Sequence, residues 1–125
     1  MMKLKMNTIH VNNLGKSFYF YKNVLNMKKV REFSPRPGTS IIFLKGKSEF
    51  MIELIADKNE EVSKKVSSNL SMGFIVENMD KTVKNLKEKN VEIIRGPMEV
   101  SGNTKLAFIR DPNGVEIEFI ESPDM

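Results

Sequence analysis

The chain of 125 residues contains no cysteine and a single histidine, His10. Without cysteine there is no disulfide framework and no thiol nucleophile, and such a chain fits a reducing cytoplasm. Apolar runs such as Ile41–Leu44 fall far short of the roughly 20 residues that span a bilayer. The first residues include Lys3 and Lys5, reach no long apolar stretch and do not resemble a signal peptide. We therefore expect a cytoplasmic protein with no membrane partner.

The sequence also lacks an arginine-rich or aromatic–basic stripe, although its net charge is +4. Nucleic-acid-binding surfaces gather such residues on one face. Here the basic residues are scattered, and Lys84, Lys87 and Lys89 are interleaved with Glu88 along one expected helix. We interpret these lysines as a solvent-exposed helix face and expect no nucleic-acid partner. The positive charge favours an anionic or neutral ligand over a polycation.

The most informative feature that is present is a repeat with a spacing of 65 residues. The segment Ile41–Lys45 returns as Leu106–Arg110, and Ile52–Ile55 returns as Ile117–Ile120. A repeat of this length is too long for a solenoid unit and too short for an independent domain, so both halves should share one core. We expect one domain over 1–125, with module one at 1–56, a polar connection at 57–70 and module two at 71–125.

Each half reads as a strand, a helix and three further strands. The expected strands are Leu4–Val11, Lys28–Phe33, Ser40–Lys45 and Glu49–Ile55, then Ser71–Val76, Val91–Ile94, Lys105–Arg110 and Val115–Glu121. Loops are expected at Phe33–Gly38 and Gly96–Asn103, and a tight turn at Asp111–Gly114, where Gly114 can adopt positive φ. The pattern predicts an α+β fold: two tandem βαβββ modules forming a curved eight-stranded mixed sheet around a cleft, with the helices on the outer face.

The two helices are expected to begin after asparagine caps. The side chains of Asn13 and Asn78 can accept hydrogen bonds from the first free backbone N–H groups of the helices that follow. Apolar residues at helical spacing give each helix one buried face. These residues are Leu14, Phe18, Tyr21 and Leu25 in the first helix and Met79, Val83 and Leu86 in the second.

Alternation along the strands predicts which residues face away from the helices. The wholly apolar side of the last strand in each module must pack on a helix, so Glu53 and Glu118 face the inner side of the sheet. In the first strand, Met6, Thr8 and His10 share that inner face. Carboxylates there are costly unless something compensates them. Glu53 and Glu118 are therefore functional candidates; the alternative is a paired or water-bridged remnant, or a partner for lysines.

Several motifs carry a resemblance to a known family over nearly the whole chain. They are the paired modules, Val11–Leu14 leading to Phe20–Leu25, and Leu106–Gly114, with its Asp-Pro-Asn-Gly turn, leading to Ile117–Glu118. On these motifs the chain resembles the vicinal oxygen chelate superfamily, the glyoxalase and bleomycin-resistance group. Metal-dependent enzymes of that family carry a histidine on the first strand and a glutamate on the fourth strand of each module.

The resemblance places the four metal-ligand positions at Met6, Glu53, Ser71 and Glu118, so both glutamates are present and both histidines are replaced. Methionine is a soft, weak ligand and serine a poor one, so the set suits no common divalent metal well. Two carboxylates with waters could hold a hard ion loosely, in the manner of magnesium or calcium. We expect no cofactor beyond such a weakly bound divalent metal.

The resemblance also implies ligand contacts. His10 matches an arginine that holds a substrate carboxylate in the glyoxalase I branch, and a protonated histidine could do this more weakly. A strand-end histidine with a local hydrogen bond is the alternative. His10 lies about 13 Å from Met6 along the strand, at roughly 3.3 Å per residue. This distance is too great for His10 to act as the metal ligand in place of Met6. Apolar walls of the cleft, or alternatively ordinary core, are implied for Ile41, Phe43, Leu106 and Phe108.

Two functions follow from these residues. The loss of both histidines favours a metal-independent protein that binds a small apolar or anionic molecule in its cleft. A cationic, bleomycin-type ligand fits a basic protein poorly. The alternative is a metal-dependent lyase or isomerase of the glyoxalase type, similar to lactoylglutathione lyase, with Glu118 as general base. Because members of this family commonly form or complete their clefts across subunits, we also expect a homodimer.

Overall fold

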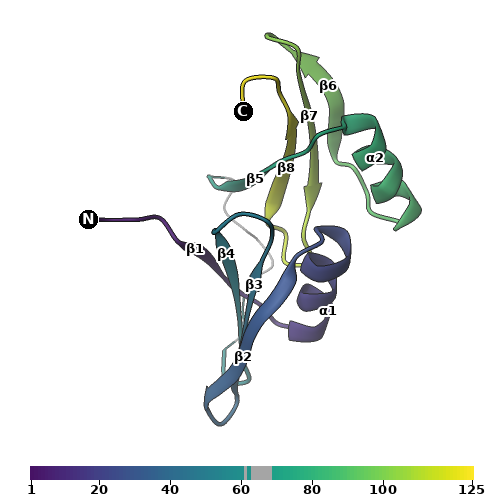
Figure 1. Ribbon diagram of the computed structural model, residues 1–125. Helices are drawn as coiled ribbons and strands as arrows, with labels where there is room; N and C mark the ends of the chain where they lie inside the picture. The colour runs from purple at the N-terminus through teal and green to yellow at the C-terminus, as the bar shows by residue number, and fades with distance from the viewer. Residues whose placement is uncertain (61, 63–68) are drawn as a thin grey trace. The chain divides into compact units, whose positions relative to one another are not determined.

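The computed structural model describes residues 1–60, 62 and 69–125 (Figure 1). The described residues fall into two compact units, one in 1–64 and one in 65–125, and each is presented by itself. Both units have the element order strand, helix, strand, strand, strand. The expected α+β fold with tandem βαβββ modules is confirmed. The expected connection at 57–70 falls in part on residues 61 and 63–68, which lie outside the described residues.

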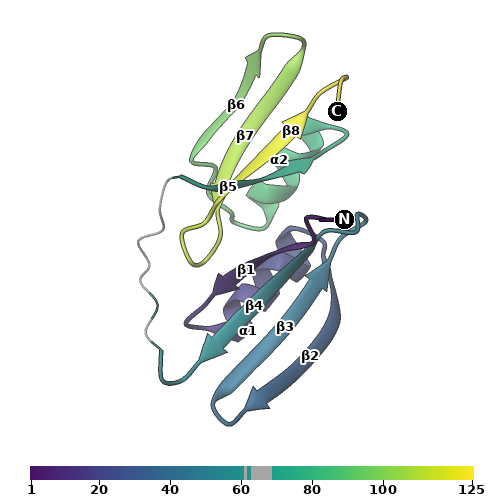
Figure 2. The same ribbon diagram turned by 90° about the vertical axis from the view of Figure 1, so that its left-hand side faces the viewer.

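Module one consists of β1 (Met6–His10), α1 (Leu14–Tyr19), a π-helical turn η1 (Phe20–Val24), β2 (Lys28–Arg36), β3 (Thr39–Lys45) and β4 (Met51–Asp57). Its sheet has the order β1-β4-β3-β2. The pair β1–β4 is parallel and the other two pairs are antiparallel, so the sheet is mixed. Figure 2 shows α1 behind this sheet, on one face only.

Module two consists of β5 (Ser71–Ile75), α2 (Met79–Glu88), β6 (Arg95–Val100), β7 (Thr104–Arg110) and β8 (Glu116–Glu121). Its sheet repeats the same order and directions, as β5-β8-β7-β6 with a parallel first pair. In the described part of the chain, the eight expected strands are thus hydrogen-bonded as two mixed sheets of four. No helix there is long and apolar enough to cross a membrane.

The two asparagine caps are confirmed. Asn13 Oδ1 accepts a hydrogen bond from the backbone N–H of Lys16 at 3.0 Å, and Asn78 Oδ1 accepts one from Lys81 at 3.0 Å. In α2 the predicted inward residues are all buried, namely Met79, Val83 and Leu86. The Asp111–Gly114 turn is confirmed as well: Gly114 has φ +90°, and Asp111 Oδ1 accepts the N–H groups of Asn113 and Val115, each at 2.8 Å.

The predicted buried face of the first helix is only partly right. Ser17, Phe20 and Tyr21 are buried, whereas Leu14, Phe18 and Leu25 are half-buried. The change from α-helix to π-helix after Tyr19 accounts for Leu25 alone, because an i→i+5 turn rotates only the side chains that follow it away from their α-helical positions.

A one-residue difference between the modules explains this turn. After the helix of module one, the N–H of Met27 donates to the carbonyl of Tyr21; after that of module two, the N–H of Val91 donates to the carbonyl of Leu86. The segment closed by this hydrogen bond is therefore one residue shorter in module two. The hairpin then restores the spacing: residues 37–38 connect β2 to β3, whereas residues 101–103 connect β6 to β7. Between helix and hairpin the structural repeat is therefore 64 residues, although the sequence aligns without a gap at 65.

The sixth strand was predicted in the wrong place. Residues 91–94 form no strand, and β6 occupies Arg95–Val100, most of which was expected to be loop. A glycine and a proline suggested a loop, but Gly96, at φ +87°, lies in an irregularity of the β6–β7 register between Arg95 and Met98. Similarly, β2 continues through the expected loop to Arg36. The other strand ends agree with the prediction to within two residues.

The predicted faces of the last strands are confirmed. Ile52 and Leu54 on β4 are buried, as are Ile117 and Phe119 on β8, and helix α1 contacts β4 while α2 contacts β8. Alternation then places the intervening glutamates on the opposite face of each sheet. We call the face opposite the helix the inner face of each module.

Candidate functional site

Glu53 lies in a row of side chains that crosses the inner face of module one. Its neighbours in the strand register are Thr8 on β1 and Phe43 on β3, and Arg31 on β2 lies opposite Phe43. Directly opposed residues on neighbouring strands point to the same face. We call Arg31, Phe43, Glu53 and Thr8 the glutamate row of module one. Within it, the Thr8 hydroxyl donates to Glu53 Oε1 at 2.6 Å.

Module two has a glutamate row at the same place, composed of Arg95, Phe108, Glu118 and Gly73. Gly73 takes the place of Thr8 and has no hydroxyl. A Cβ added at Gly73 would lie 3.9 Å from Glu118 Oε1, so the carboxylate reaches over the glycine. Among the residues that the structure describes, none donates a hydrogen bond to the Glu118 side chain. The two glutamates are therefore held differently.

In each module a second row, next to the glutamate row, contains the residue that the resemblance matches to a histidine, Met6 or Ser71. In module one it runs through Lys28, Lys45, Met51 and Met6. In module two the corresponding row runs through Arg110, Glu116 and Ser71. We call these the neighbouring rows.

Aromatic rings lie beside the glutamates in both modules. Phe33 and Phe43 stack with centroids 6.3 Å apart and planes inclined by 9°, and the Arg31 guanidinium carbon lies 4.3 Å from the Phe33 centroid. In module two the Arg95 guanidinium carbon lies 3.9 Å from the Phe108 centroid. Cation–π contacts of this kind hold an arginine over an apolar surface. The inner faces thus combine carboxylate, aromatic and guanidinium groups.

The fold and these motifs agree with comparisons to known proteins. Residues 3–119 match the family described as the Glyoxalase/Bleomycin resistance protein/Dioxygenase superfamily. The chain belongs to this superfamily. Lactoylglutathione lyase of Salmonella typhimurium is 30% identical over 129 residues, covering 98% of this chain and 95% of that protein. A probable lactoylglutathione lyase of Synechocystis is 30% identical over 123 residues, covering 91% of each.

Solved structures show the same relationship. Glyoxalase I of Leishmania major, a trypanothione-dependent enzyme, superimposes with a TM-score of 0.80 at 25% identity, covering all of this chain and 90% of that one. A mutant glyoxalase I from Zea mays gives a TM-score of 0.82 at 24% identity. This chain covers 44% of the maize protein, and at that identity the likeness shows the fold alone.

The residues that the resemblance matches to the metal ligands of the superfamily do not fit a tightly bound transition metal. Each module contributes one carboxylate, Glu53 or Glu118, and its other position is the thioether of Met6 or the hydroxyl of Ser71. Nickel and zinc sites in proteins are built mainly from imidazole and thiolate ligands. In the described parts of the chain, no three His, Cys, Asp or Glu side chains are grouped as metal ligands. Glu53 also already accepts the Thr8 hydroxyl.

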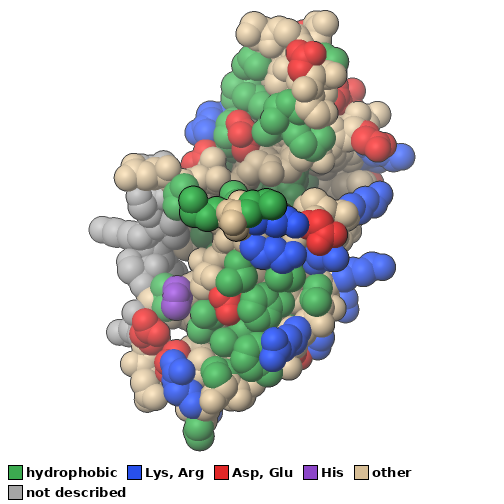
Figure 3. All heavy atoms as spheres, turned by 60° about the vertical axis from the view of Figure 1, so that its left-hand side comes forward, with side chains coloured by type: hydrophobic (Ala, Val, Ile, Leu, Met, Phe, Trp, Pro, Cys, Tyr) green, Lys and Arg blue, Asp and Glu red, His purple; other side chains and the backbone are tan. Residues whose placement is uncertain are grey.

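His10 lies on the inner face of module one, opposite Ile55, and its side chain is exposed. Figure 3 shows the histidine beside a group of hydrophobic side chains with an acidic side chain among them. No described residue forms a hydrogen bond with its imidazole, so the local bond considered as the alternative is not found. A role in holding a ligand stays a prediction.

The four predicted lining residues lie on the inner faces. Ile41 and Phe43 share the face of Glu53, and Leu106 shares that of Glu118, since Ile41 pairs with Ile55 and Leu106 with Ile120. Phe108 lies directly beside Glu118. Ile41 and Phe108 are buried, while Phe43 and Leu106 are half-buried. That both inner faces form one cleft stays a prediction.

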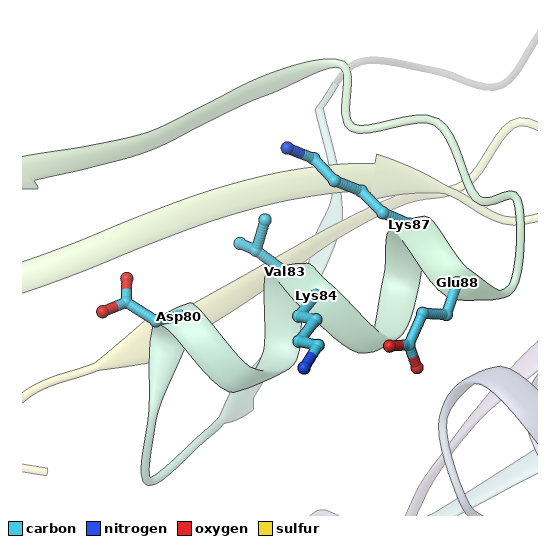
Figure 4. Close-up of a pocket in the computed structure, with 5 residues that line it drawn as sticks. All are labelled: Asp80, Val83, Lys84, Lys87 and Glu88. Atoms are coloured by element: carbon cyan, nitrogen blue, oxygen red, sulfur yellow. The ribbon is translucent and has the colours of Figure 1, made fainter.

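A hollow of about 500 Å³ lies elsewhere, along α2 (Figure 4). Its lining residues are Asp80, Val83, Lys84, Lys87 and Glu88, all from this one helix. Among the described residues no second element lines it, and four of the five side chains are charged. We therefore do not consider this hollow a candidate ligand site.

Sequence reasoning missed three features of the site. It placed Thr8 on the same face as Glu53 by strand alternation but assigned no role to its hydroxyl, which donates to Glu53. It did not find Arg31 and Arg95, because these equivalent arginines are 64 residues apart and the repeat was read at 65. It also overlooked that Met51 and Glu116, equivalent at 65, differ in charge; that contrast was visible in the sequence.

Proposed function

We propose that the protein binds a small apolar or anionic molecule on the inner faces of its modules and holds no stoichiometric transition metal. What supports this proposal is the donor set: the resemblance matches Met6 and Ser71 to the two histidines of the family, and Thr8 already donates to one carboxylate oxygen of Glu53. What remains are aromatic and aliphatic side chains with a few polar groups beside them, the usual composition of a small-molecule site.

Metal analysis of protein purified without chelator tests this proposal. We expect far less than one equivalent of nickel, zinc or manganese, because two carboxylates prefer hard ions in fast exchange with water. We also expect no turnover of a glutathione hemithioacetal. Tight stoichiometric metal in the purified protein would overturn the proposal.

The second candidate function is a lyase or isomerase of the glyoxalase type. Relatives named lactoylglutathione lyase match more than 90% of this chain at 29–30% identity, which favours it. In this alternative Glu118, whose carboxylate accepts no hydrogen bond from a described residue, would take and return a proton at the substrate carbon. Turnover that is abolished in Glu118→Gln and retained in Glu53→Gln would establish this role.

We also propose a homodimer and a cytoplasmic location. The proposal of a homodimer rests on family membership alone. The fold does not define which surface the two copies would share. Sedimentation at micromolar concentration measures it, and a monomer under those conditions would contradict it. The location rests on the cysteine-free composition.

A further inference from the structure

We infer that the inner face of module one holds an anion subsite formed by Lys28, Lys45 and Arg31. The subsite takes the acidic group of a small amphipathic anion, such as an aromatic carboxylate, sulfonate or phosphate, whose apolar part lies on Phe33 and Phe43. This inference deepens the proposed function and rests on it, because it assigns a ligand class to the same surface.

The two lysines are placed directly opposite each other. Lys28 on β2 pairs with Lys45 on β3, and the next residue of that row, on β4, is Met51. Like charges in directly opposed positions destabilise a sheet unless a counter-charge is near. Among the described residues, neither lysine forms an ion pair. A bound anion would supply the missing counter-charge.

The acidic residues at or next to the two ends of β4 are already engaged with other cations. Glu49 pairs with Lys5 at 3.7 Å, and Asp57 pairs with Arg36 at 3.8 Å. Each of these pairs is long and one member is largely exposed, so it contributes little stability; it nevertheless places both charges together. Lys29 forms an ion pair with Glu32 at 2.7 Å. In the strand register both lie opposite buried residues of β3, on the side of the sheet that α1 covers and not on the inner face. The remaining inner-face acid in the two rows is Glu53.

Module two shows what neutralisation of the same surface looks like. There the counterpart of Met51 is Glu116, which accepts a hydrogen bond from Arg95 at 2.7 Å and lies opposite Arg110. Its two rows contain two arginines and two glutamates. The two rows of module one contain three basic side chains, Lys28, Lys45 and Arg31, and one acid.

An apolar surface adjoins the basic side chains. Phe43 is the register neighbour of Arg31 and stacks on Phe33, and Ile41 lies two residues further along β3. Figure 3 shows basic side chains gathered beside the hydrophobic group of this face. A ligand with an aromatic body and one acidic group satisfies both parts at once, whereas a neutral ligand satisfies only the aromatic part.

A matched pair of fluorescent probes tests the subsite. The anion 8-anilinonaphthalene-1-sulfonate and the neutral N-phenyl-1-naphthylamine share one aromatic framework and differ in the sulfonate. We expect the unmodified protein to bind the anion at least about tenfold more tightly, a difference of about 1.4 kcal/mol. Met51→Glu, which copies Glu116 into module one, should remove this preference and leave the affinity for the neutral probe unchanged.

Two further variants act as controls. Lys45→Met should also remove the preference, and it keeps the inference testable if Met51→Glu does not fold, as judged by circular dichroism. Lys84→Met lowers the net charge by the same amount on the exposed surface of α2, and the preference should persist. Higher salt should reduce the preference in the unmodified protein.

The outcomes separate the two proposals. Equal affinity for both probes, or a preference that survives Met51→Glu and Lys45→Met, overturns the subsite and leaves the proposed function intact. No binding of either probe counts against the proposed function itself. If Lys45→Met changes the sedimentation behaviour but not the probe preference, the lysine pair is a contact between copies of the chain, and the subsite is overturned.

Discussion

The two modules share one backbone plan but differ at the ends and middle of the rows that cross their inner faces. Module one has Thr8 beside its glutamate and Met51 in the neighbouring row, where module two has Gly73 and Glu116. Glu53 is therefore held by a hydroxyl, while Glu118 reaches over a glycine. The neighbouring rows show the opposite relation: Arg110 of module two shares its row with Glu116, whereas Lys28 and Lys45 of module one share theirs with no acid.

The edge strands β2 and β6 place equivalent arginines in the same register position, although the local structure before and after each strand differs. Arg31 and Arg95 lie opposite equivalent phenylalanines, Phe43 and Phe108, even though the chain between helix and hairpin differs by one residue. A π-helical turn and a shorter hairpin take up the difference in module one. The position of the arginine relative to the sheet is thus kept while the local structure around it varies.

The largest expected effect comes from making both neighbouring rows end in histidine. In the double variant Met6→His with Ser71→His, each module would present an imidazole near its glutamate. We expect nickel or zinc affinity to rise by about 100-fold or more, since changes in outer-shell partners alone alter affinity by about 10–100-fold. Titration calorimetry measures it, with Met6→Ala and Ser71→Ala as the control. No gain would mean that the metal positions have been aligned wrongly.

The next effect concerns the register irregularity between Arg95 and Met98 in module two. In Gly96→Ala the new Cβ would lie 2.6 Å from the carbonyl oxygen of Leu106, at a φ of +87° that disfavours L side chains. We expect a loss of about 2 kcal/mol in the free energy of unfolding. Urea denaturation measures it. Gly46→Ala is the control, because an added Cβ there meets nothing within 4 Å. Equal urea midpoints for the two variants would show that β6 tolerates a side chain at residue 96, contrary to this expectation.

Much of each module could be predicted from the sequence because the relevant signals are local. Alternation along β4 and β8 placed Glu53 and Glu118 on the inner face, and the asparagines before the helices marked their starts. The π-helical turn could not be predicted, because the longer helix end and the shorter hairpin of module one cancel in a gapless comparison. The bond between Thr8 and Glu53 joins residues 45 positions apart, so it depends on strand register.

A smaller effect tests the hydroxyl that distinguishes Glu53 from Glu118. Thr8→Val keeps the shape and the β-branching but removes the donor to Glu53. We expect the free energy of unfolding to fall by about 1 kcal/mol, the usual net contribution of one hydrogen bond. Thr8→Ser restores the donor and should recover most of the loss. A carbon-13 NMR signal of the Glu53 carboxyl that shifts in the valine but not the serine variant would show that the bond itself is responsible.

The smallest expected effect comes from giving Glu118 the hydroxyl that Glu53 already has. In Gly73→Ser the added Cβ would lie 3.9 Å from Glu118 Oε1, close enough for the serine hydroxyl to donate to it. The same Cβ would lie 3.3 Å from Cδ1 of Ile120, the flexible end of a half-buried side chain, which must move by a few tenths of an ångström. We expect the variant to gain about 0.5 kcal/mol, since glycine inside a strand also costs stability relative to alanine.

Gly73→Ala separates the two contributions to that gain, because it adds the Cβ and the contact with Ile120 without the hydroxyl. Thermal unfolding of the serine and alanine variants side by side measures the difference. If the serine variant is more stable than the alanine variant, the hydroxyl has bonded to Glu118, and the two glutamates have become alike. Serine no more stable than alanine would show that the carboxylate of Glu118 is directed away from β5. The asymmetry between the modules would then lie in the orientation of the glutamates rather than in the residue beside them.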